Sequence, residues 1–159
     1  MSSDTFTTAM FLITAVIAAG VLINAVFPVV YQMTGTFASA THNSDERLRT
    51  DFNIVATFAK ASGETQVYMK NIGSRSIPVN DIKKSDVFFG TTTGTIARLD
   101  YQSEWTYRIH GNSQDNWAPG DTLEIDLNSP ITLQPGDQVY FQFILPNAVQ
   151  RSTQFGVST

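Results

Sequence analysis

Apolar residues dominate the first part of the chain, whereas the remainder alternates between apolar and polar positions. Residues 9–27 are apolar except for Thr14, Gly20 and Asn24, and residues 5–44 contain no charged side chain. The 19 residues of 9–27 predict a helix of roughly 28 Å, which matches the hydrocarbon thickness of a bilayer. A helix that is apolar on all sides fits a membrane anchor and also the packed core of a helical filament.

The pattern beyond this segment predicts that the helix continues as a stalk. Pro28 has no backbone N–H and its ring crowds the preceding turn, so we expect a kink at this position. The more polar segment 34–49 is predicted to be a helical stalk. The chain therefore divides into a hydrophobic helix with its stalk, residues 1–49, and a second domain, residues 50–159.

Small residues on the helix indicate where another helix could approach closely. Ala15 and Ala19 form a small-xxx-small pair, and we place Gly20 and Asn24 on an adjoining stripe, where Asn24 could share a hydrogen bond. The alternative is that these residues simply face lipid. The predicted helix–helix interface comprises Ala15, Ala19, Gly20, Asn24 and Pro28.

A secretory signal peptide also contains an apolar segment, but two features predict that this helix is retained. No Lys or Arg precedes it, and the pattern Ala38-Ser39-Ala40 lies 11 residues after Phe27, too far for ordinary cleavage. The first basic residue, Arg47, has acidic neighbours, so charge does not fix the side of the membrane on which the second domain lies.

From Asp51 onward the apolar residues alternate, which predicts β-strands. Phe52–Phe58 and Gln66–Asn71 flank the turn residues Ser62-Gly63 and are predicted to form a hairpin. Further strands are expected at Asp86–Phe89, Ile96–Tyr101, Trp105–Ile109, Leu123–Leu127, Val139–Leu145 and near Phe155–Val157. Short strands at this spacing predict a mainly β domain built as an antiparallel two-sheet sandwich.

The inward-facing positions of these strands give the expected core. Asp121, Glu124 and Asp126 are no more than a weak candidate for a cation site, because alternation along the strand places Glu124 and Asp126 on the exposed face. The predicted core consists of Phe52, Ile54, Phe58, Val67, Met69, Ile72, Val87, Phe89, Leu123, Ile125, Val139, Phe141, Phe143 and Leu145.

Composition and charge exclude several classes of function. The net charge is −4 and the basic residues are scattered among acidic ones, which argues against nucleic acid as a partner. There is no cysteine for a disulfide or a thiolate metal site. His42 and His110 lack the spacing of a metal site or a catalytic triad and are expected on the solvated surface. We predict no catalytic residue, no metal, no cofactor and no small-molecule substrate.

Four aromatic residues lie in the loop-rich segment 91–120, where side chains can face a partner. The alternative is that Trp105 and Trp117 close one end of the sandwich. The predicted partner surface comprises Tyr101, Trp105, Tyr107 and Trp117.

Several motifs resemble archaellum accessory proteins of the FlaG and FlaF type, and FlaG most closely. They are Thr7-Thr8-Ala9, Ile23-Asn24-Ala25-Val26-Phe27-Pro28, and Val67 to Ser74, which contains Lys70-Asn71-Ile72-Gly73-Ser74. The last motif is shared with archaellins and other archaeal envelope sandwiches, and its Asn and Gly are expected to build a turn after a strand.

This resemblance implies a pilin-like hydrophobic helix that carries an immunoglobulin-like β-sandwich outside the cytoplasmic membrane. It also implies a protein that oligomerises beside the rotating archaellum and grips the surface layer as part of the stator. The implied partners are the membrane, further copies of the chain, a FlaF-type protein and a surface-layer protein. The implied location is the cell membrane or the archaellum.

Three hypotheses of function remain open from the sequence. The first is a non-catalytic stator element that links the archaellum motor to the cell envelope. The second is a pilin-like or archaellin-like subunit of an extracellular helical filament. The third is a membrane-tethered module that binds an envelope glycan or a cation.

Overall fold

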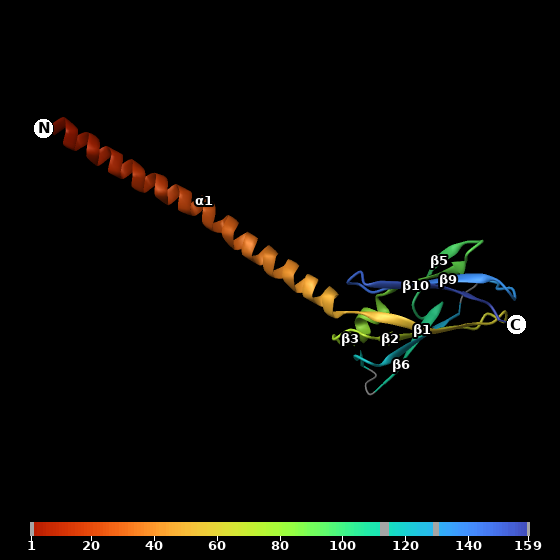
Figure 1. Cartoon of the computed structure of the whole chain (residues 1–159). Coiled ribbons are helices and arrows are strands. Elements are labelled where there is room, and N and C mark those ends of the chain that lie inside the picture. The colour runs from red at the N-terminus through yellow and green to blue at the C-terminus, as the bar shows by residue number, and fades with distance from the viewer. Residues whose placement is uncertain (1, 112–114, 129–130, 159) are drawn as a thin grey trace. The chain divides into compact units, whose positions relative to one another are not determined.

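The computed structural model describes residues 2–111, 115–128 and 131–158, which form one long helix and a β-domain (Figure 1). They separate into two compact units, with the boundary between Asn43 and Ser44. The last residues of the helix, Ser44–Arg49, thus belong to the same unit as the strands. We call this second unit the β-domain.

Helix α1 comprises Ser2–Arg49 and continues through Pro28 without interruption. Six threonine hydroxyls on this helix donate hydrogen bonds to the carbonyl oxygen four residues earlier, at distances of 2.8–2.9 Å. Thr14 Oγ1, for example, donates to the carbonyl oxygen of Met10. Because these hydroxyls are satisfied within the helix, they need no water, and the helix surface remains compatible with an apolar environment.

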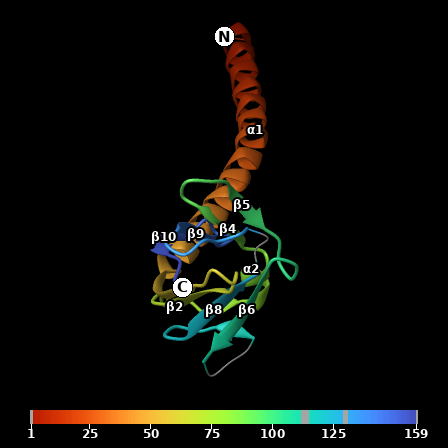
Figure 2. The same cartoon turned by 90° about the vertical axis from the view of Figure 1, so that its right-hand side faces the viewer.

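Two four-stranded antiparallel sheets form the β-domain and appear as separate layers in Figure 2. The order of the first sheet is β1 (Phe52–Ala59), β2 (Thr65–Asn71), β8 (Thr122–Leu127) and β6 (Trp105–His110). The order of the second is β10 (Gln150–Gly156), β9 (Gln138–Ile144), β4 (Asp86–Thr91) and β5 (Ile96–Leu99). The antiparallel two-sheet sandwich on one long helix confirms the predicted fold class.

Three short elements were missed by the sequence pattern. Strands β3 (Ile77–Pro78) and β7 (Asn116–Trp117) pair with each other, and the short helix α2 (Val79–Lys83) follows β3. Two-residue strands carry no alternation that a sequence pattern could detect. They add Ile77, Ile82 and Trp117 to the core.

Aromatic contacts join the inner faces of the two sheets. The ring of Phe143 on β9 lies 5.6 Å from that of Phe52 on β1 and 6.4 Å from that of Trp105 on β6, both edge to face. The ring of Phe52 also lies 5.6 Å from Trp117. Phe143 is fully buried and therefore holds the two sheets together at the centre of the core.

Most of the predicted core is confirmed, but two positions are wrong. Strand β1 has a bulge at Val55, because Ile54 pairs with Met69 whereas Ala56 pairs with Tyr68. The extra residue reverses the alternation, so Phe58 lies on the outer face and is 40% exposed.

Ile72 is the second incorrect core position. It follows Asn71, whose side chain is buried, so alternation turns Ile72 outward, and it is 56% exposed. Ile54 is only partly buried, and the other predicted core residues are buried: Phe52, Val67, Met69, Val87, Phe89, Leu123, Ile125, Val139, Phe141, Phe143 and Leu145.

Phe143→Ala should lower the free energy of unfolding of the β-domain by about 3–5 kcal/mol, because it leaves a cavity between the sheets. The matched control is Phe58→Ala on the outer face, for which we expect about 1 kcal/mol or less. Urea unfolding of the full chain in detergent, followed by the fluorescence of Trp105 and Trp117, measures both. Equal losses for the two variants would contradict the reversed alternation of β1.

Candidate functional site

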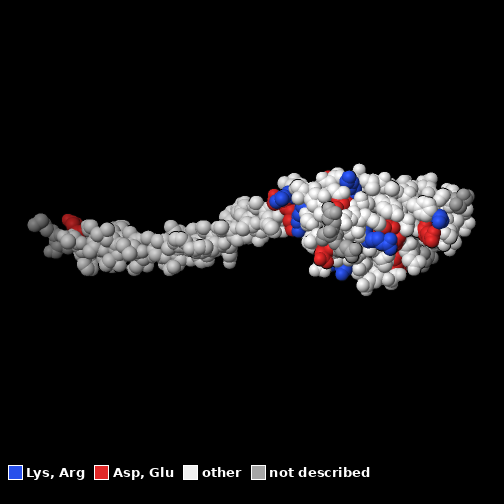
Figure 3. All heavy atoms as spheres, turned by 90° about the horizontal axis from the view of Figure 1, so that it is seen from below, with Lys and Arg blue, Asp and Glu red and all other residues white. Residues whose placement is uncertain are grey.

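The surface of α1 is apolar and uncovered within the single chain. Between Phe6 and Phe37 its large apolar side chains are 47–73% exposed. Among the described residues, α1 is the one helix that is long and apolar enough to cross a membrane. Charged side chains gather over the β-domain instead (Figure 3). Such a surface requires lipid or other helices to cover it.

The predicted interface residues lie on two nearly opposite faces of α1, not on adjoining stripes. A helix turns by about 100° per residue, so the Ala15 and Ala19 pair is centred about 160° away from Gly20, Asn24 and Pro28. Apart from Gly20 itself, its two chain neighbours and the nearby helix backbone, no heavy atom lies within 4 Å of the place where a Cβ of Gly20 would stand. Contact of either face with a second helix stays a prediction.

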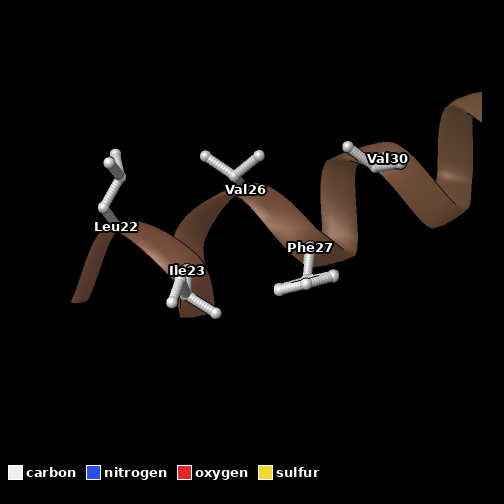
Figure 4. Close-up of a pocket in the computed structure, with 5 residues that line it drawn as sticks. All are labelled: Leu22, Ile23, Val26, Phe27 and Val30. Carbon is white, nitrogen blue, oxygen red and sulfur yellow. The ribbon is translucent and has the colours of Figure 1, made fainter. Parts of the chain in front are cut away.

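A shallow apolar hollow lies on the face of α1 that carries Ala15 and Ala19. Its lining residues recur at intervals of four and place it over the same side of the helix as the two alanines. They are Leu22, Ile23, Val26, Phe27 and Val30 (Figure 4).

The four aromatic residues of the predicted partner surface differ in burial. Trp105 is 1% exposed and Trp117 is fully buried, so the expectation that their side chains face a partner is wrong, and both pack in the sandwich. Tyr101 and Tyr107 are half-buried, and their rings stack with centroids 5.9 Å apart. These two tyrosines remain at the edge of β6 as a predicted partner surface.

The C-terminal turn of α1 is held by the segment Asn71–Arg75, which we call the cap loop. The carbonyl oxygen of Arg49 accepts hydrogen bonds from the backbone N–H of Ser74 and Arg75, at 3.0 and 3.1 Å. The carbonyl oxygen of Asp51 accepts from Ile72 and Gly73 at 3.0 and 2.9 Å. The carbonyl oxygen of Arg49, the last residue of α1, is thereby satisfied by the cap loop.

The residue types of the cap loop follow from this geometry. The side chain of Asn71 is buried, donates to the carbonyl oxygens of Arg75 and Trp117 at 2.9 Å each, and accepts from the N–H of Gly73 at 3.0 Å. A Cβ on Gly73 would lie 2.5 Å from the carbonyl oxygen of Arg49. The Asn-x-Gly pattern is therefore explained by a turn that must approach the helix end closely.

Side chains add further links between the helix end and the sheets. Arg75 forms an ion pair with Glu46 on α1, and both side chains are mostly buried. Asp51 pairs with Arg151 on β10 at 2.5 Å. These pairs connect the helix end to both sheets.

Glu124 on β8 is buried on the outer face of the first sheet, which the sequence did not predict. Its side chain is 5% exposed, because Tyr68 on β2 and Arg108 on β6 stand directly opposite it. One carboxylate oxygen lies 2.5 Å from His110 Nε2, and the other accepts a hydrogen bond from the Tyr68 hydroxyl at 3.1 Å. Arg108 Nη1 lies 3.9 Å away. The expectation that Glu124 is exposed is therefore wrong. His110 is exposed, as expected, and it also contacts Glu124.

The environment of Glu124 lowers its pKa. Burial alone would raise the pKa of this carboxyl, but hydrogen bonds from His110 and Tyr68 and the charges of His110 and Arg108 hold the pKa below its ordinary value. The burial of Glu124 could have been predicted only from the pairing of the strands, because Tyr68, Glu124 and Arg108 lie side by side across three strands. Register of this kind is not visible in one sequence.

No three His, Cys, Asp or Glu side chains in residues 2–111, 115–128 and 131–158 come together in a way that could hold a metal ion. The cluster around Glu124 is thus a packed polar network, in which every carboxylate oxygen already has a protein partner.

Comparison with known proteins identifies the family of the chain. A model of the archaeal-type flagellin family matches residues 5–155, which include α1 and the β-domain. The chain belongs to the archaeal-type flagellin family. An uncharacterized protein of Archaeoglobus fulgidus is 26% identical over 162 residues, which cover 98% of this chain and 99% of that protein.

Solved structures of archaellum components share the fold of this family member. The periplasmic stator protein FlaG of Sulfolobus acidocaldarius matches with a TM-score of 0.57 and 23% identity, over 67% of this chain and 99% of that one. The FlaF and FlaG stator complex of the same organism matches with 0.55 and 22%, over 65% and 87%. The archaeal flagellum of Methanospirillum hungatei strain JF1 matches with 0.72 and 12%, over 96% and 93%.

We predict that Gly73→Ala lowers the stability of the β-domain by about 1–3 kcal/mol, since the added methyl group overlaps the backbone of the helix end. Gly156→Ala is the control, because a Cβ there meets only the end of the flexible Gln138 side chain at 3.4 Å. Urea unfolding compares the two variants. A Gly73→Ala chain as stable as the control would show that the cap loop does not depend on close approach.

Glu124 should make the stability of the β-domain depend on pH. Because its folded-state pKa lies below the ordinary value of 4.5, this contribution is complete above that pH and is lost as the pH falls through the folded pKa. Glu124→Gln should therefore flatten the fall in unfolding free energy below about pH 4.5. Tyr68→Phe, which removes one of the hydrogen bonds, should give an intermediate slope. Parallel curves for all three chains would refute the assignment.

Proposed function

We propose that this chain is a non-catalytic structural component of the archaellum machinery that acts as a stator element. In this role α1 anchors the protein in the cytoplasmic membrane, and the β-domain lies outside the cell membrane and binds the envelope. The observation that carries the proposal is the exposed surface of α1, which is free of charge over residues 5–44, on a chain of the archaeal-type flagellin family.

A membrane anchor is supported by the chemistry of α1. Residues 5–44 carry no charge, and the hydroxyls of Thr14 and Thr34 donate to backbone carbonyls within the helix, which lowers the cost of placing this segment in lipid. The apolar part is long enough to span the hydrocarbon core. The small residues at Ala15 and Ala19, and at Gly20 and Asn24, offer close approach to other copies of the helix.

Transmission of force is supported by the cap loop. A stator must resist torque, and it can do so without chemistry if its anchor and its binding domain are mechanically linked. Backbone hydrogen bonds and the ion pair Glu46–Arg75 tie the last turn of α1 to the cap loop, and the ion pair Asp51–Arg151 ties the segment just after α1 to β10. A load on the helix end would be shared by several bonds at once.

Partners of this element can be proposed from the family and its structures. The solved complex of FlaF and FlaG suggests a FlaF-type protein as one partner, and a surface-layer protein would be the second. Tyr101 and Tyr107 at the edge of β6 are the proposed contact with the envelope partner. This arrangement requires neither a cofactor nor a small-molecule substrate.

A filament subunit is the second candidate. It is supported by the match to the flagellum of M. hungatei, which extends over 96% of this chain and so includes α1. The opposite placement of Ala15 and Ala19 against Gly20, Asn24 and Pro28 also suits a helix with neighbours on more than one side.

Deletion of the gene in the source archaeon separates the two functions. If the chain is a stator element, cells will still assemble archaella, visible by electron microscopy, but will swim poorly or not at all. If it is the filament subunit, the filaments themselves will be lost. Complementation with the intact gene is the control. Cells with normal filaments and normal swimming would rule out both functions.

A further inference from the structure

The free edge of strand β6 differs from the other long edge of the same sheet. At the opposite edge, β1 is interrupted by the bulge at Val55, and Lys60 covers the ring of Phe58 at 5.1 Å. Bulges and lysines of this kind block the pairing of an edge with another strand. Strand β6 pairs with β8 in unbroken register along all six residues, contains neither bulge nor proline, and ends its sheet (Figure 2).

The direction of the backbone groups of β6 follows from three hydrogen bonds at its start. The carbonyl oxygen of Glu104 accepts from Asn128, on the side of β8. The next residue, Trp105, donates to Asp100 and accepts from Gln102, on the opposite side. Successive residues of a strand point their N–H and C=O groups to alternate sides. The backbone groups of Tyr107 and Ile109 therefore point out of the sheet, away from β8.

A hollow lies along this edge. It has a volume of about 400 Å³ and is lined by Tyr101, Thr106, Tyr107, Arg108 and Ile109. Residues from both faces of β6 line it, so it follows the edge of the strand and not one face of the sheet. The stacked rings of Tyr101 and Tyr107 provide an apolar wall on the inner side.

We propose that the open edge of β6 binds an extended strand of a different protein, which hydrogen-bonds to Tyr107 and Ile109 and places a carboxylate opposite Arg108. Arg108 is 69% exposed, and its cross-strand neighbour within the sheet is already an acid, Glu124. Among the described strands, none pairs with β6 on its open side. An acidic residue there, with an apolar residue on either side facing Tyr107 and Ile109, gives a complementary strand.

A second copy of β6 fits this edge poorly. Pairing Tyr107 with Ile109 of the copy sets Arg108 against Arg108, and like charges directly opposite are unfavourable. Centring the pair on Tyr107 requires the backbone of Trp105, which is already bonded to Asp100 and Gln102. Centring it on Ile109 sets Tyr107 opposite Gly111, beyond the end of the strand.

This inference deepens the proposed function. The identity of the partner as an archaellum or envelope protein rests on that function. The strand edge itself can be tested without any archaellum component. The swimming of the deletion strain therefore tests the proposed function, and peptide binding to the edge of β6 tests the strand-edge proposal.

The test uses amide hydrogen exchange of the full chain in detergent, measured by NMR. In the free chain the amides of Thr106, Arg108 and His110, bonded to β8, should exchange at least about tenfold more slowly than those of Tyr107 and Ile109. The probe is a peptide with the first five residues of β8, Thr-Leu-Glu-Ile-Asp, whose glutamate can face Arg108 as Glu124 does and which stops short of the position opposite Trp105. Excess peptide should slow the exchange of Tyr107 and Ile109 alone.

The charge of the probe provides the matched control. A peptide with lysine in place of the central glutamate should bind about two- to fivefold more weakly. With Arg108→Gln, which adds no second carboxylate beside Glu124, that preference should vanish while both peptides still bind. Unchanged tryptophan fluorescence shows that the variant is folded.

Four outcomes would overturn the proposal. Slow exchange of Tyr107 and Ile109 in the dilute free chain would mean that the edge is closed. Protection that grows with protein concentration would mean that a second copy occupies it. Peptide binding that leaves these two amides unchanged, or no binding of either peptide, would place partner recognition elsewhere.

Discussion

The exposed apolar surface of α1 is the constraint on which the rest of the molecule depends. Seventeen large apolar side chains between Phe6 and Phe37 are about half or more exposed, and covering each of them is worth about 1.5–3 kcal/mol. Their sum exceeds the stability of an ordinary domain, about 5–15 kcal/mol. The chain therefore favours association with lipid or with other helices far more strongly than it favours a dispersed state in water. The threonine hydroxyls of the segment do not oppose this, since Thr14 and Thr36 donate to carbonyl oxygens within the helix.

The β-domain then has to remain attached to a helix whose surface is covered by lipid or by other helices. The cap loop meets this need with groups that the fold already supplies, because the carbonyl oxygens of Arg49 and Asp51 each accept two backbone hydrogen bonds from a turn between sheet residues. Asn71 fixes that turn from inside the core, and Gly73 leaves room for it. A motif that could be taken for a binding loop is accounted for by its contact with the helix end, and no ligand is needed to explain its residues.

Local patterns predicted the elements well, and contacts between distant segments account for the errors. The length of α1 and seven of the strands follow from charge, apolar periodicity and turn residues in the neighbourhood of each element, whereas β10 begins at Gln150, well before the strand expected near Phe155–Val157. Phe58 was misplaced because the bulge at Val55 exists only in the pairing of β1 with β2. Trp105 and Trp117 were misplaced because a loop-rich segment gives no sign of which aromatic rings meet the opposite sheet. Glu124 was missed since its burial requires Tyr68 and His110 from two other strands.

The two open surfaces of the molecule favour different kinds of association, and together they bear on the choice between stator and filament. Contact of the faces of α1 with copies of the same helix is a prediction that both candidates share. The edge of β6 discriminates between the candidates, because it pairs poorly with β6 of a second copy. One register sets Arg108 opposite Arg108 of the copy, and another requires the backbone of Trp105, which is already hydrogen-bonded. The third register extends beyond the end of the strand. A subunit surrounded only by its own copies has little use for an edge that is complementary to an acidic strand of another chain. A stator, which must join two different bodies, needs such a surface, and this asymmetry favours the stator.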